Sequence, residues 1–92
     1  MKTFIINKNH LNSLDDFYDE IEKNFIKDNT LNFGRNLDAL EDVLYGGYGV
    51  FEPGETIKII WENFDESKKT IKNIDVIEEI INDNKNIIFE KK

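Results

Sequence analysis

Residues 33–49 of this chain read FGRNLDALEDVLYGGYG, a helix-forming segment with glycines on both sides. Asn36 is a residue type that caps the first turn of a helix, so we predict a helix that begins there and continues to about Tyr45. Side chains three and four positions apart lie on the same side of a helix. This spacing predicts an apolar face that holds the helix on the core, made of Leu37, Leu40 and Leu44.

The same spacing gathers three acids, Asp38, Glu41 and Asp42, on a neighbouring face of the predicted helix. Like charges so placed destabilise a helix by roughly 0.2–0.5 kcal/mol per pair. Asp38 lies in the first turn, where the positive end of the helix dipole favours an acid. Glu41 and Asp42 therefore form either an ordinary solvated face or a surface for a cationic partner. Tyr45 and Tyr48 flank the following glycines and suit either partner contact or solvent.

The charge of the whole chain favours a basic partner. The 92 residues include 12 Lys and Arg against 19 Asp and Glu, a net charge of −7. Within residues 34–55 there are five acids and a single basic residue, Arg35, which gives this segment a net charge of −4. Nucleic-acid affinity rests mainly on clustered Lys and Arg, so direct binding to nucleic acid is disfavoured.

The length of 92 residues suits one small domain that spans residues 1–92. The chain has no cysteine, which rules out a disulfide framework or a thiolate metal site and fits a reducing compartment. Near the start only three apolar residues follow one another, too few for a signal peptide, and no apolar run is long enough to span a membrane. We therefore expect a cytoplasmic protein.

Apolar periodicity elsewhere predicts three strands separated by helices. The strands cover residues 2–6, 56–61 and 86–90. The first helix is capped by Ser13 or Asp15 and ends at Asp28-Asn29-Thr30, and the other helices cover about residues 36–45, 65–71 and 75–83. Strands that alternate with helices usually pair in parallel. We therefore predict an α/β fold with a three-stranded parallel sheet and about four helices.

The pattern also predicts which apolar side chains are buried. The first strand is expected inside the sheet and the second is expected to be covered on both faces. The strand side chains assigned to the core are Phe4, Ile5, Ile6, Ile57, Ile59, Ile60, Trp61 and Phe89. The helix side chains assigned to the core outside residues 36–45 include Phe17, Phe25, Ile77, Ile80 and Ile81.

Catalytic patterns are weak. Nucleophilic catalysis needs a base beside the nucleophile, but the chain has one histidine, His10, at a polar strand end. Asp38 and Asp42 on one exposed helix face would converge poorly around a metal ion, and no calcium-loop or dinucleotide glycine pattern occurs. We expect a protein that is not an enzyme and binds no cofactor; a metal-dependent hydrolase that uses the two aspartates is the rival hypothesis.

Two motifs carry a family resemblance. Gly34-x-Asn36-Leu37-Asp38-Ala39-Leu40-x-Asp42 resembles the signature helix of the barstar family, the intracellular inhibitors of barnase-type ribonucleases. Residues 61–68, WENFDESK, resemble the second strand of that family as it runs into the third helix. The resemblance covers nearly the whole chain and implies the same three-stranded parallel sheet with four helices.

The resemblance implies an immunity protein whose second helix and preceding loop plug the active site of a basic ribonuclease, with acids replacing RNA phosphates. Asp42 matches the dominant interface acid of the family and Asp38 a second one. The partner is expected to be a ribonuclease toxin, bound as a heterodimer by a chain that is monomeric when free; a module that binds another basic protein without inhibiting it is the alternative. The implied partner-binding residues are Asn32, Phe33, Gly34, Arg35, Asn36, Asp38, Glu41, Asp42, Gly46, Gly47 and Tyr48.

The sequence departs from the barstar pattern at three aromatic positions. Asn32, Glu41 and Gly47 stand where barstar has aromatic interface residues. The segment from residue 46 to residue 61 is longer than in barstar, and its glycines resemble a distinct branch with a glycine-rich loop. The interface acid on the last helix of the family falls near Asn82 or Asp83. These departures point to a different nuclease target.

Overall fold

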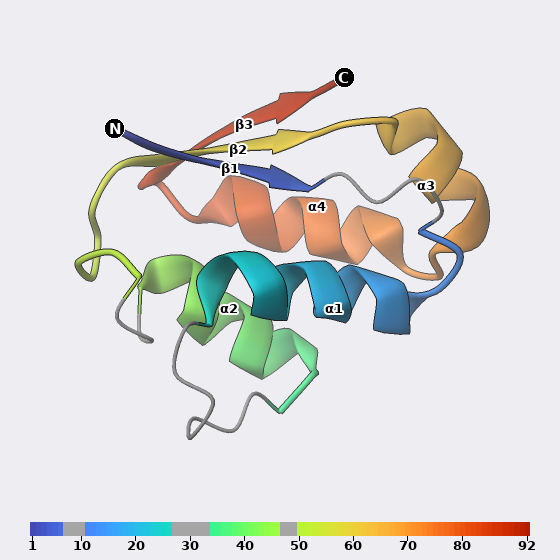
Figure 1. Ribbon diagram of the computed structural model, residues 1–92, viewed down its shortest axis with the longest axis horizontal. Helices are drawn as coiled ribbons and strands as arrows, with labels where there is room; N and C mark the ends of the chain where they lie inside the picture. The colour runs from blue at the N-terminus through green and yellow to red at the C-terminus, as the bar shows by residue number, and fades with distance from the viewer. Residues whose placement is uncertain (7–10, 27–33, 47–49) are drawn as a thin grey trace.

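The computed structural model describes residues 1–6, 11–26, 34–46 and 50–92 (Figure 1). The strands are β1 (Lys2–Ile6), β2 (Ile57–Trp61) and β3 (Ile87–Lys91). In the described ranges the helices are α1 (Leu14–Phe25), α2 (Leu37–Tyr45), α3 (Phe64–Thr70) and α4 (Ile74–Asp83). The prediction of an α/β fold with a three-stranded parallel sheet and four helices is confirmed.

The strands lie in the order β1-β2-β3, and both neighbouring pairs are parallel. β2 is therefore the central strand, and Ile59 pairs with Phe4 on one side and Phe89 on the other. The expectation that β1 lies inside the sheet is wrong, because β1 forms one edge. Parallel connections cross over in a right-handed sense, so strands added in one direction bring their helices to one face. Figure 1 shows α1, α2 and α4 together on one side of the sheet.

Burial alternates along β2 as this one-sided arrangement requires. Ile57, Ile59 and Trp61 are fully buried, whereas Ile60 between them is half-buried. On the same uncovered face Ile5 and Ile88 are 45% and 46% exposed. The predicted burial of β2 on both faces and of Ile5 is therefore wrong. The sequence shows apolar residues on both sides of the strands, but the described helices cover only one face.

The predicted core is otherwise largely confirmed. Ile6, Phe17, Phe25, Ile77 and Ile81 are buried. Phe4, Ile80 and Phe89 were expected in the core but are half-buried and pack against its edge.

Aromatic rings join the layers around Trp61. Its indole stacks on Phe17 of α1 with ring centres 5.1 Å apart and meets the ring of Phe64 edge-on at 5.0 Å. The indole Nε1 donates a hydrogen bond of 3.1 Å to Ser67 Oγ on α3. The buried N–H group of Trp61 is thereby satisfied, as a buried polar group must be. Trp61 is a core residue, as predicted.

The two faces of the sheet should respond differently to the loss of an isoleucine. Replacing Ile59 by alanine leaves a cavity in the buried face and should lower the free energy of unfolding by about 2–5 kcal/mol. Ile88→Ala, the matched change on the exposed face, should cost less than about 1 kcal/mol. Denaturant unfolding of the two variants measures both values, and equal losses would contradict a sheet that is covered on one face.

Candidate functional site

Helix α2 begins as its sequence predicts. The Oδ1 atom of Asn36 accepts a hydrogen bond of 2.8 Å from the backbone N–H of Ala39, the usual N-cap contact. The Nδ2 atom of Asn36 donates to the carbonyl of Gly34 at 3.3 Å, so the same side chain also fixes the residues that lead into the helix. The side chain of Asn36 therefore bonds both to the segment before the helix and to the first turn of α2.

The buried face of α2 differs from the prediction at its first residue. Leu40 and Leu44 are fully buried, and Val43 completes the apolar face. Leu37 was assigned to this face but is 38% exposed. It is the first helical residue, nearly one turn before Leu40, and the N-terminal end of the helix is not covered by the core.

The acidic stripe consists of Asp38, Glu41 and Asp42, and all three side chains are exposed. Among the described residues no Lys or Arg nitrogen lies within 4.0 Å of their carboxylates. The stripe continues to Tyr45, whose side chain is 55% exposed three positions after Asp42. The structure thus brings the predicted acids together on a free surface of α2.

Gly46 ends α2 in a left-handed conformation, with φ at +111°. Its N–H donates to the carbonyl of Val43 at 3.1 Å, as at a glycine C-cap. A Cβ atom at this position would lie 3.0 Å from both the carbonyl oxygen of Glu52 and a ring carbon of Phe51. Gly46 is buried, so it determines how α2 ends and is not itself part of the exposed surface.

Arg35 points away from the acidic stripe toward α1. Its Nη2 atom donates to the carbonyl of Asp15 at 2.7 Å and to Asp19 Oδ1 at 3.0 Å, and its Nη1 atom donates to Glu22 Oε1 at 3.2 Å. Burial lowers the pKa of the guanidinium, but the hydrogen bond to Asp19 and the charges of Glu22, Asp19 and Asp15 outweigh it, so the pKa lies above its usual value. Burial raises the pKa of the neighbouring Tyr18 phenol, and the charge of Arg35 opposes that effect.

The remaining predicted site residues divide into two groups. Gly34 and Asn36 are exposed and lie at the start of α2, directly before the acidic stripe. The predictions for Asn32, Phe33, Gly47 and Tyr48, and for His10, lie outside the described residues.

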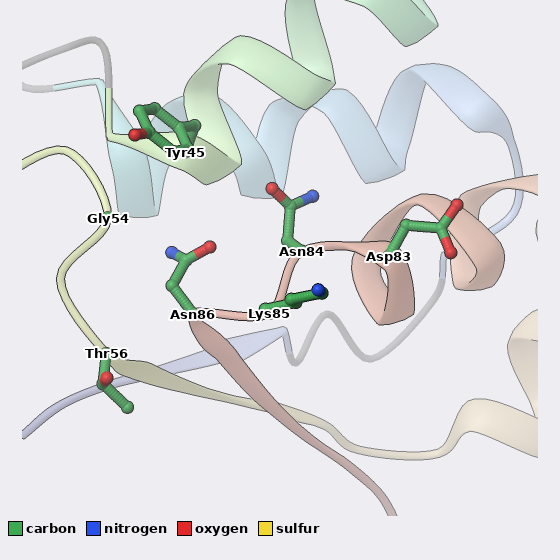
Figure 2. A pocket seen from close by; sticks show the side chains of 7 residues that line it. All are labelled: Tyr45, Gly54, Thr56, Asp83, Asn84, Lys85 and Asn86. Atoms are coloured by element: carbon green, nitrogen blue, oxygen red, sulfur yellow. The ribbon is translucent and has the colours of Figure 1, made fainter.

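A polar hollow of about 440 Å³ lies beside the C-terminal end of α2 (Figure 2). Asn86 helps to form it, because its Nδ2 atom donates to the carbonyls of Leu44 and Glu55 at 3.4 and 3.2 Å. The residues that line the hollow are Tyr45, Gly54, Thr56, Asp83, Asn84, Lys85 and Asn86. The hollow could not be predicted from the sequence because its lining comes from three separate segments. The expectation of an interface acid near Asn82 or Asp83 is the one sequence feature that pointed to this region.

In residues 1–6, 11–26, 34–46 and 50–92 no group of three His, Cys, Asp or Glu side chains is placed to hold a metal ion. Within the same ranges no helix is long and apolar enough to cross a membrane.

Fold and site together define a small α/β protein that presents to solvent an acidic helix whose carboxylates have no basic partner among the described side chains. In a comparison with models of known families, residues 1–91 match the family described as Barstar (barnase inhibitor). The chain therefore belongs to the barstar family, whose members are ribonuclease inhibitors and not enzymes. A search of curated proteins found no match.

The cap of α2 can be tested separately from any partner. Asn36→Ala removes the acceptor for the Ala39 N–H and should lower the free energy of unfolding by about 0.5–2 kcal/mol. Asn36→Asp keeps an acceptor at the positive end of the helix and should restore most of that loss. Chemical denaturation measures both variants; equal destabilisation would show that the capping oxygen is unimportant.

Proposed function

We propose that this chain is a non-enzymatic immunity protein that binds a basic ribonuclease and blocks its RNA site with α2. The observation that carries the proposal is the acidic stripe, three exposed carboxylates without a basic partner among the described side chains. The stripe lies in a chain that matches the barstar family over residues 1–91. Ribonuclease active sites bind phosphates through cationic groups, and carboxylates suit the same groups.

The proposed mechanism has two stages. The excess negative charge of the chain first steers a cationic partner toward α2 and raises the rate of association. Asp42 and Asp38 then form charge-assisted hydrogen bonds with arginine side chains of the nuclease as water leaves the interface. The partner is bound one to one, and RNA is excluded because α2 occupies its site.

Preorganisation of α2 supports tight binding. The helix is capped at its start by Asn36 and closed at its end by Gly46, and the Gly54 N–H donates to the carbonyl of Tyr45 at 3.0 Å. A partner that meets a helix already in place loses less conformational entropy on binding. The stripe therefore needs no folding step when the complex forms.

We infer that the choice of nuclease lies in the surroundings of the two aspartates. Glu41 adds a third carboxylate where barstar has an aromatic residue. Tyr45 extends the stripe toward the polar hollow, where Asp83 supplies a further acid. A nuclease with an additional cationic group beside its phosphate site would complement this surface better than one with an apolar pocket there.

The Asp42 carboxylate should dominate the binding energy. Asp42→Ala is expected to weaken binding to the inhibited ribonuclease by more than about 2 kcal/mol, as at a hot spot, and to leave the free energy of unfolding unchanged or slightly higher. Inhibition constants are measured against barnase and a panel of basic ribonucleases. Glu66→Ala, which removes the same charge on α3, is the control and should bind nearly as well as the parent chain.

Two outcomes would contradict the proposal. Full inhibition by Asp42→Ala, of a nuclease that the parent chain inhibits, would reject the assignment of the site. A complex in which the nuclease still cleaves RNA would instead favour a module for basic proteins that leaves the active site open.

A further inference from the structure

Arg35 is the one basic residue within residues 34–55, and it directly precedes the cap of the acidic helix. A cation at this position would oppose a basic partner if it pointed outward. Its guanidinium instead lies among three acids of α1, at 3.0 Å from Asp19, 3.2 Å from Glu22 and 3.8 Å from Asp15. The charge of Arg35 is thus matched within the protein.

Asp15, Asp19 and Glu22 lie on one face of α1, because Asp19 follows Asp15 by four positions and Glu22 follows Asp19 by three. The guanidinium of Arg35 can contact all three residues at once because its N–H donors form a planar fork. It also lies 5.8 Å from the centre of the Tyr18 ring, and its side chain is only 31% exposed. These contacts tie α1 to the residue just before Asn36, although 13 to 20 positions of sequence separate the partners.

The backbone of Arg35 supports the same conclusion. Its φ of +51° lies in the left-handed region, which is unfavourable for residues other than glycine. A glycine would adopt this conformation without a steric cost. The side-chain contacts to α1 must therefore offset the backbone strain at this position.

We propose that Arg35 is a positioning residue that holds the N-terminal end of α2 on the acidic face of α1 and thereby fixes the direction of the acidic stripe. In this proposal the Arg35 side chain acts through its contacts with α1 and does not touch the partner. The effect on α2 is a property of the free protein, whereas its effect on inhibition rests on the proposed function.

Amide hydrogen exchange of the free protein tests the positioning role. Arg35→Gln should speed exchange of the Ala39 and Leu40 amides, which bond to Asn36, by about tenfold, while the Ile59 amide of the central strand keeps its rate. Arg35→Lys should give a smaller increase, because an ammonium is a point charge without the planar fork. Lys69→Gln, which breaks an exposed pair with Glu66 on α3, is the control and should change none of these rates.

The Arg35→Gly variant keeps the test possible if Arg35→Gln fails to fold. It removes the side-chain contacts but relieves the backbone strain, so the protein stays folded while the first turn of α2 loosens. Unchanged exchange at Ala39 and Leu40 in both the glycine and the glutamine variants would overturn the positioning role.

A double-mutant cycle with Glu22→Gln separates positioning from direct contact. If Arg35 acts through α1, Arg35→Gln should weaken inhibition by about tenfold in the parent chain and by clearly less in the Glu22→Gln background. The same loss in both backgrounds would mean that Arg35 contacts the nuclease itself, which would overturn the proposal. If the parent chain inhibits no ribonuclease but the amides still exchange faster, the proposed function fails and the positioning role stands.

Discussion

The buried indole of Trp61 at the carboxyl end of the central strand is the contact on which the arrangement of the site depends. Its stacking on Phe17 holds α1 beneath the sheet, and its N–H bond to Ser67 holds α3 beyond the strand end. Helix α1 in turn supplies the acids that receive Arg35. The acidic stripe is therefore fixed through a series of contacts that begins in the core, although none of its own carboxylates takes part in packing.

Helix α2 is fixed at both ends by polar contacts and in its middle by apolar ones. Asn36 satisfies the first turn, and Asn86 donates to the carbonyl of Leu44 near the last. The apolar face between them leaves the opposite side of the helix free to carry unfavourable like charges. A helix held in this way tolerates repulsion that would weaken an isolated one. That tolerance permits an exposed acidic surface at modest cost to the fold.

The features that could be predicted from the sequence are those set by neighbouring residues. The cap at Asn36, the bounds of α2 and the parallel sheet follow from short-range spacing and from the alternation of strands with helices. The exposure of Leu37 and Ile5 depends on which faces other segments cover, and spacing along one element does not contain that information. The contacts of Arg35 and the lining of the hollow join distant segments, so local pattern could not reveal them. Family resemblance predicts Asp38, Asp42 and Arg35 alike at the partner surface, and it gave no sign that Arg35 pairs with acids of α1.

The sequential order of the sheet also affects when a newly made chain can complete its fold. β1 pairs with β2, so Lys2 cannot form its pair in the sheet until Ile57 has been synthesised. The segment with α1 and α2 leaves the ribosome before Trp61, the side chain against which Phe17 packs. Parallel pairing between strands so far apart in sequence carries an entropic cost that a local helix does not, so it forms more slowly than the helix. The delay between translation and a fixed orientation of the acidic surface is thus set by the synthesis of the central strand, not by the helix that bears the charges.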